Sequence, residues 1–135
     1  MPRQKTKKQI TNIPNFMGYK PIGIHSAKEE NINLLFEEYQ AIDLIDYRNM
    51  NFEQAAIAMN ISKTSFARLI TTARKKIATA FVQCKPIKAI PGDNISDFNW
   101  FRCEECFYVI KKRKPKQINQ CPECLSEKLK NIFEQ

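Results

Sequence analysis

Residues 51–83 read NFEQAAIAMNISKTSFARLITTARKKIATAFVQ, and this stretch decides the fold expected for the first two-thirds of the chain. Asn51 and Gln54 have the spacing of a capping box, which predicts a short helix from about 52 to 59. Asn60 tolerates the left-handed conformation that ends a helix, and Ser62 is a good N-cap for the next one. A second helix of about 20 residues is predicted by an apolar face made of Phe66, Leu69, Ile70, Ala73, Ile77, Ala80 and Phe81.

A short helix, a tight turn and a longer helix are the parts of a helix-turn-helix. Upstream, apolar residues recur at intervals of three or four and predict an acidic amphipathic helix over roughly 33–48. We therefore expect a mainly α fold, with a three-helix helix-turn-helix domain at 29–88. The Pro- and Gly-containing segment 1–28 is expected to be a basic extended arm, and the turn-rich segment 89–97 a linker.

The last 38 residues, 98–135, alternate short aromatic and β-branched runs with cysteines, which predicts a small β-type zinc ribbon. Two Cys-x-x-Cys pairs stand 14 residues apart, and this spacing can place four thiolates around one structural Zn²⁺. The predicted ligands are Cys103, Cys106, Cys121 and Cys124. A segment this short cannot bury a sufficient apolar core, so metal binding would supply the missing stability.

Three other interpretations of the cysteine pairs are open. Rubredoxin-like iron fits the second pair, although Leu125 replaces the glycine usual in that knuckle. A thioredoxin-type dithiol lacks its βαβ context. Disulfides would need an oxidising compartment, whereas the absence of an apolar signal core predicts a cytoplasmic protein.

The net charge of +8 comes from 22 basic and 14 acidic residues and is unevenly distributed. Segments 1–20 and 61–90 contain bases and no acid, whereas 21–60 is acidic. Acid-free basic segments indicate a polyanionic partner, and with the helix pair they favour double-stranded DNA. The predicted DNA-binding residues are Ser62, Lys63, Thr64, Ser65, Arg68, Arg74, Lys75, Lys76, Arg3 and Lys5.

Among these residues, the turn from Ser62 to Arg68 is expected to enter the major groove, where Arg68 reaches a base edge. Residues 74–76 are expected to contact backbone phosphates or to remain solvated, and Arg3 and Lys5 are expected to contact the minor groove or phosphates. The plain alternatives are three-helix packing without DNA for the helices and a disordered basic tail for the arm. The basic run 111–116 is open to three interpretations, a second nucleic-acid contact, a partner-docking tip or a solvated turn.

Segments 1–3, 19–24, 59–68 and 73–78 resemble a widespread prokaryotic family of small, uncharacterised, predicted DNA-binding proteins. The core of that family is similar to the helix-turn-helix of sigma-factor region 4, and the resemblance covers about residues 1–92. It implies a DNA-binding role without an established ligand, promoter or activity. The chain departs from the family pattern at four positions, with His25 in place of Pro, Asp43 in place of Arg, and Asn60 and Cys84 in place of Gly.

The sequence contains no paired carboxylates, nucleophile-base pair or phosphate loop, so we expect no catalytic residues and no enzyme activity. No run approaches the roughly 18 to 20 apolar residues that span a membrane. The predicted function is a sequence-specific DNA-binding transcription regulator, and a homodimer would suit paired half-sites. The alternatives are a zinc-ribbon adaptor that binds a protein of the transcription machinery, and an RNA-binding accessory protein.

Overall fold

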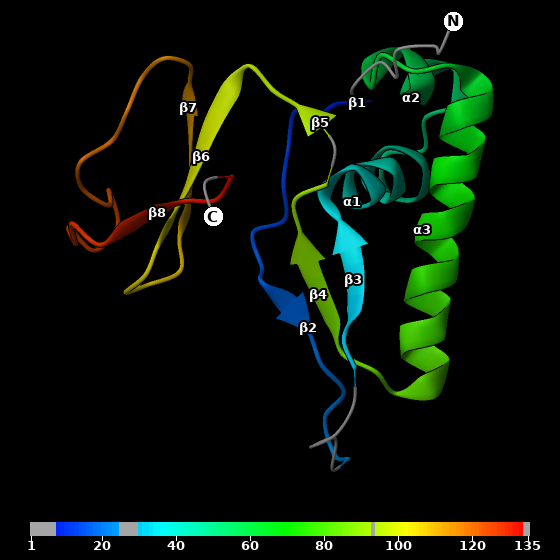
Figure 1. The fold of residues 1–135 in the computed structure, drawn as a ribbon, viewed down its shortest axis with the longest axis horizontal. Helices are drawn as coiled ribbons and strands as arrows, with labels where there is room; N and C mark the ends of the chain where they lie inside the picture. Colours follow the sequence, from blue (N-terminus) through cyan, green and yellow to red (C-terminus); the bar gives the residue numbers. More distant parts are fainter. Residues whose placement is uncertain (1–7, 25–29, 93, 134–135) are drawn as a thin grey trace, which may run out of the picture. The chain divides into compact units, whose positions relative to one another are not determined.

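The computed structural model describes residues 8–24, 30–92 and 94–133 (Figure 1). The chain divides into two compact units, residues 1–95 and 96–135, each described by itself below. The expectation of a mainly α fold with a three-helix domain is wrong. In the described part of the chain, three α-helices and one π-helical turn are accompanied by strands in three sheets, two of which belong to the first unit.

The first unit contains a three-stranded sheet in the order β2-β4-β3. Its strands are β2 (Gly18–Tyr19), β4 (Ile87–Ile90) and β3 (Ile32–Leu35). The central strand β4 is antiparallel to β2 and parallel to β3. A second small sheet pairs β1 (Lys8–Gln9) with β5 (Asn94–Ile95) in parallel. Helix α3 runs alongside the three-stranded sheet, with β3 nearest to it (Figure 1).

The helix expected over 33–48 is instead a strand, a short helix and a π-helical turn. Residues Ile32–Leu35 form β3, α1 spans Phe36–Ile42, and η1 is a π-helical turn over Asp43–Tyr47. The spacing of the apolar residues Ile32, Leu34 and Leu35 fits a helix or a strand, and pairing with β4 makes this segment a strand. Helix α1 begins after Leu35, whose backbone N–H donates to Glu38 Oε1 at 2.8 Å.

The expected linker and arm are also parts of the fold. Part of the segment 89–97 belongs to the central strand β4, and Pro86 and Pro91 flank this strand instead of interrupting it. In the described part of the expected arm, Ile10 and Ile13 are buried. Segments whose local sequence predicts an arm or a linker are therefore held in the fold by contacts with distant parts of the chain.

The helix pair was predicted closely. Helix α2 spans Phe52–Ala58, and the capping box is present, with Asn51 Oδ1 accepting from the Gln54 backbone N–H at 2.7 Å. Asn60 is left-handed at φ 56°, and Ser62 caps helix α3, which spans Lys63–Gln83. The predicted apolar face of α3 contributes its buried side chains to the core, namely Phe66, Ile70, Ala73 and Ala80.

The second unit is an antiparallel sheet in the order β7-β6-β8. Strand β6 spans Phe98–Cys103, β7 spans Val109–Arg113 and β8 spans Leu129–Asn131. The expected short strands are therefore present. Its small apolar core consists of Trp100, Phe101, Ile110 and Ile132. Across both units, none of the described helices has the length and apolar character needed to cross a membrane.

Candidate metal centre and nucleic-acid interface

The two cysteine pairs lie in turns with matching backbone geometry. In the first, the Phe107 N–H donates to the Cys103 carbonyl, and the Cys103 N–H donates to the Tyr108 carbonyl, both at 2.9 Å. In the second, the Leu125 N–H donates to the Cys121 carbonyl, and the Cys121 N–H donates to the Ser126 carbonyl, again at 2.9 Å.

The fifth residue of each turn is left-handed, with φ of 67° at Phe107 and 65° at Leu125. Each pair is thus presented by the same kind of knuckle.

The four sulfur atoms form one compact cluster. All lie within 4.8 Å of one another, with 3.5 Å between Cys103 Sγ and Cys124 Sγ and 3.6 Å between Cys106 Sγ and Cys121 Sγ. A tetrahedral ion with metal–sulfur bonds of about 2.3 Å needs sulfur atoms about 3.8 Å apart. The measured separations fit that arrangement and exceed the roughly 2.04 Å of a disulfide. The cluster can therefore hold a metal ion such as zinc.

The protonation of the cluster differs between its members. The backbone N–H of Cys106 lies 3.5 Å from Cys103 Sγ and is the main reason that the pKa of the Cys103 thiol is lowered to about 7. The backbone hydrogen bond from Ser126 lowers the pKa of the Cys124 thiol, but the neighbouring sulfur atoms of Cys103, Cys106 and Cys121, together with desolvation, outweigh it and raise this pKa to about 12. Four adjacent thiolates repel one another, so full deprotonation requires a cation among them.

The second candidate site is the start of α3. Ser62 Oγ accepts from the Ser65 N–H at 3.0 Å and caps the helix, and the side chains of Lys63, Thr64, Ser65 and Arg68 are exposed. Within α3, Thr64, Arg68, Thr71 and Lys75 follow one another at spacings of four, three and four, so they share one exposed face. This face contains no acid and begins at the positive end of a 21-residue helix.

Two of the basic residues predicted to bind DNA form ion pairs inside the first unit. Arg74 forms an ion pair with Asp46 of η1 at 2.7 Å. Lys76 Nζ lies 2.7 Å from Glu38 Oε1 of α1 and donates to the Asn33 carbonyl at 2.9 Å. Both residues therefore bind α3 to the acidic segment 21–60. Arg3 and Lys5, the predicted arm contacts, lie outside the described residues, as does His25.

Sequence reasoning missed the polar side chains that assemble the first unit. Gln40 on α1 is buried, and its Oε1 accepts from the backbone N–H groups of Thr11 and Asn12 at 2.7 and 3.2 Å. Glu38 is buried as well and caps the start of α1. Glu38 caps the N-terminus of α1 without the usual Ser or Thr at the N-cap, which is Leu35, so neither Glu38 nor Gln40 is marked by a local sequence signal.

Two compact units, one with a sheet flanked by a long basic helix and one with a four-sulfur cluster, define a small α/β protein with a candidate metal centre. Residues 1–97 match the family described as "Protein of unknown function DUF134", and the chain belongs to that family. The resemblance seen in the sequence is thereby confirmed at the level of an uncharacterised family found in bacteria and archaea.

The chain is similar to proteins named UPF0251 protein over nearly its whole length. The relative from Chloroherpeton thalassium is 33% identical over 133 residues, which cover 98% of this chain and 87% of the relative. The relative from Methanothermobacter thermautotrophicus is 35% identical over 130 residues, covering 96% and 67%. The relative from Halothermothrix orenii is 32% identical over 132 residues, covering 95% and 98%. No solved structure matches the chain.

Proposed function

We propose that this protein binds double-stranded DNA in a sequence-specific manner and acts as a transcription regulator, with the start of α3 entering the major groove. The observation that carries the proposal is the exposed, acid-free first turn and outer face of α3, which follow a short helix and a tight turn. A helix presented in this way fits the width of the major groove.

The contacts follow from which side chains are exposed. The N-terminus of α3 and the hydroxyl groups of Thr64 and Ser65 are suited to backbone phosphate. Arg68 stands one turn further along the same face, where its guanidinium can donate two hydrogen bonds to guanine. Lys75 follows two turns later and suits a second phosphate. Arg74 and Lys76 contribute by holding α3 in place through their ion pairs.

The test is selection of bound duplexes from a random DNA library, with single-stranded RNA as competitor. We expect the wild-type chain to enrich one sequence pattern, with an affinity that falls steeply as salt rises. Arg68→Ala should relax the preference at one base position and weaken binding by about 1–3 kcal/mol. Lys75→Ala should weaken binding to all sequences and leave the pattern unchanged.

The matched control is Arg74→Ala, which removes a guanidinium from the same helix but from a residue already paired with Asp46. Because Arg74 holds α3 in place, Arg74→Ala is expected to weaken binding to all duplexes equally, and its selected base pattern should equal that of the wild type. Equal enrichment of every duplex by wild type and Arg68→Ala would refute base reading. Preferential retention of the RNA competitor would favour the RNA-binding alternative.

For the second unit we propose one structural Zn²⁺, held by Cys103, Cys106, Cys121 and Cys124. The support is the all-sulfur donor set, which closes the tetrahedron without leaving a position for substrate. Metal analysis of the purified chain should find one zinc per molecule, and Cys121→Ser should lower this content. Iron in place of zinc, or an unaltered metal content in Cys121→Ser, would overturn the assignment.

An adaptor role for the second unit is the second candidate function. Phe107 and Leu125 are 58% and 64% exposed and occupy equivalent positions in the two knuckles. Exposed apolar side chains at matching positions favour a protein contact. Under this alternative, purified RNA polymerase should bind the wild-type chain but not a Phe107→Ser/Leu125→Ser variant, and the duplex selection should yield no pattern.

A further inference from the structure

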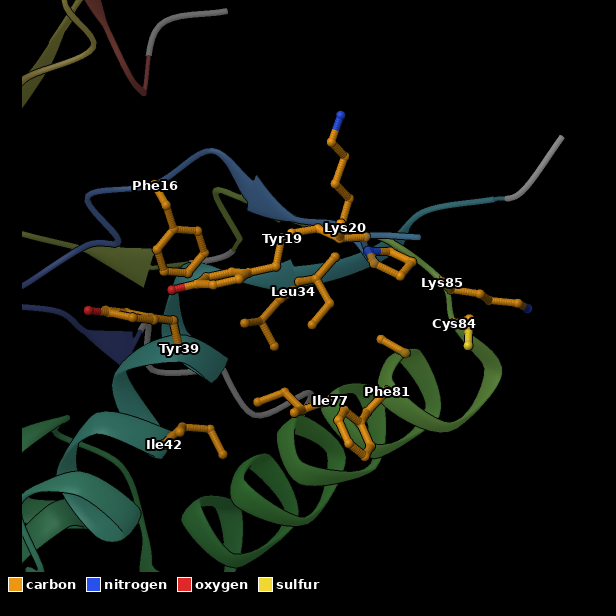
Figure 2. A pocket seen from close by; sticks show the side chains of 14 residues that line it. Phe16, Tyr19, Lys20, Leu34, Tyr39, Ile42, Ile77, Phe81, Cys84 and Lys85 are labelled. Atoms are coloured by element: carbon orange, nitrogen blue, oxygen red, sulfur yellow. The ribbon is translucent and has the colours of Figure 1, made fainter. Parts of the chain in front are cut away.

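The first unit contains an apolar groove of about 630 Å³ between the C-terminal half of α3 and the three-stranded sheet (Figure 2). The sheet contributes Leu34 of β3 and Ile87 of β4, and α3 contributes Ile77 and Phe81. In Figure 2, Leu34 points from the sheet toward these two side chains of the helix. The volume lies within the range of about 300–1,000 Å³ that is typical of small-molecule sites.

One end of the groove is walled by aromatic rings that pack on one another. The ring of Phe16 meets Tyr19 edge-on at 4.6 Å and Tyr39 at 6.0 Å, measured between centroids. Two other lining side chains, those of Phe81 and Ile22, are 86% and 96% exposed. Large apolar side chains that are exposed together beside a groove indicate a ligand-binding or interaction site.

The charges of the lining residues have one sign. Two of the fourteen lining residues are charged, Lys20 and Lys85, and none is acidic. Figure 2 shows the two lysine side chains extending away from the apolar lining in different directions, so the ammonium groups lie outside the groove, on the solvent side of its mouth, and the interior is apolar. An anionic group held at such a mouth keeps its contact with water and avoids the cost of burying a charge.

We propose that this groove binds a small amphipathic carboxylate, with its hydrocarbon body between α3 and the sheet and its carboxylate at the mouth near Lys20 and Lys85. A straight-chain fatty acid of medium length has this chemistry. The two positive side chains disfavour a second copy of the chain in the same place, because a symmetric contact would bring like charges together. They likewise disfavour a cationic ligand.

The experiment is calorimetric titration of the full chain with sodium decanoate, below its micelle-forming concentration and without DNA. Its outcome is therefore independent of the proposed DNA-binding function. Octanoate, decanoate and dodecanoate should bind with rising affinity, by roughly four-fold for each added CH₂ group. Decanol and decylamine have the same hydrocarbon body, and both should bind more weakly than decanoate.

Two pairs of variants locate the site. Phe81→Ala should weaken decanoate binding by about ten-fold. Val82→Ala, which truncates the neighbouring exposed side chain outside the lining, should leave binding unchanged. The double variant Lys20→Gln/Lys85→Gln should weaken binding by about two- to five-fold, as expected for exposed charges. Lys88→Gln, an exposed lysine outside the groove, is its control.

Several outcomes would overturn the proposal. One is the absence of saturable decanoate binding, and another is binding that Phe81→Ala does not alter. Equal affinity for decanol and decanoate, unchanged in the lysine double variant, would refute the anionic class of ligand. Sedimentation of the ligand-free chain as a dimer that Phe81→Ala converts to a monomer would show that the groove is an interface between copies.

Discussion

Arg74 and Asp46 face each other across the contact between α3 and η1. Arg74 Nη2 donates to Asp46 Oδ1 at 2.7 Å, and Arg74 Nε donates to Asp46 Oδ2 at 3.1 Å, so the pair is bidentate. Lys76 and Glu38 form a second bridge between α3 and the acidic segment. Part of the excess of basic residues in segment 61–90 is therefore neutralised by acidic residues of the first unit. The DNA-binding surface that we propose contains fewer cations than the sequence of this segment suggests.

The Arg74–Asp46 pair makes stability dependent on pH in acid. The hydrogen bond from Arg74 lowers the pKa of Asp46 below its ordinary value of 3.8. A lowered folded-state pKa stabilises the protein above about pH 4, and this contribution is lost as pH falls through the folded-state pKa. Because both side chains are nearly half exposed, we expect Asp46→Asn to cost less than about 1 kcal/mol at pH 6.

Urea unfolding, followed by the helical circular dichroism signal, measures this difference. The gap between wild type and Asp46→Asn should narrow as the pH is lowered from 6 to 3, and it should also narrow in 1 M salt. A gap that stays constant across this pH range would show that Asp46 acts through packing and not through its charge.

The parts of the fold that could be predicted depend on local chemistry. The α2–α3 pair was readable because Asn51, Asn60 and Ser62 each satisfy or terminate a helix end within a few residues. The cysteine cluster could be predicted because the two ligands of each knuckle lie within four residues of each other in the sequence. The sequence thus indicated which sulfur atoms meet, although the two turns, separated by 14 residues, are brought together by the pairing of β6 with β8.

The errors concern residues whose structure is decided by distant partners. Ile32–Leu35 pairs in parallel with Ile87–Ile90, more than 50 residues away, and a parallel pair leaves no hairpin signal between its strands. Gly18–Tyr19 is antiparallel to the same strand. The apolar spacing of the first segment predicts a helix, and the prolines that flank the second predict a linker. Only the pairing of the two segments with each other makes both of them strands.

Gln40 is expected to hold the segment around Thr11 on the first unit. Its side chain is 1% exposed and makes hydrogen bonds to Thr11, Asn12 and Gln9. Gln40→Met keeps the length of the side chain but leaves these backbone groups without their partner. We expect a loss of about 1–3 kcal/mol in the free energy of unfolding.

Limited trypsin digestion provides the local readout for Gln40→Met. Cleavage after Lys8 should accelerate, while cleavage within α3 should not. Gln83→Met, a change of the same type at an exposed position at the end of α3, is the control and should behave as wild type. Equal acceleration at all sites would indicate global destabilisation in place of local release.

Metal removal should affect the two units differently. The described helices all lie in the first unit, whereas Trp100, the one tryptophan of the sequence, is 2% exposed in the second. If zinc supplies the stability that this small core lacks, a chelator should shift Trp100 fluorescence to longer wavelength. The helical circular dichroism signal should stay within a few per cent of its starting value.

Added Zn²⁺ should restore the Trp100 emission, and added Mg²⁺ should not, because thiolates prefer the softer ion. Unchanged emission after complete metal removal would contradict a structural role for the ion. Parallel loss of the helical signal would show that the first unit depends on the second.

Cys84 offers a stabilising substitution. It ends α3 in the left-handed conformation, with φ 56° and ψ 42°, and its side chain is exposed. This conformation costs a residue with a Cβ roughly 1–2 kcal/mol, and glycine avoids most of that cost. Allowing for the greater flexibility of glycine in the unfolded chain, we expect Cys84→Gly to stabilise the first unit by about 0.5–1 kcal/mol.

Thermal unfolding monitored by the helical signal should then show a midpoint several degrees higher, since about 1 kcal/mol corresponds to about 4–8 °C in a unit of this size. Asn60→Gly should gain less, although Asn60 has the same φ of 56°, because asparagine tolerates this conformation better than cysteine does. Cys84→Ala retains the Cβ and removes only the thiol, so it separates the two effects. A rise in Cys84→Ala equal to that in Cys84→Gly would mean that the thiol, and not the backbone conformation, limits the stability of this helix end.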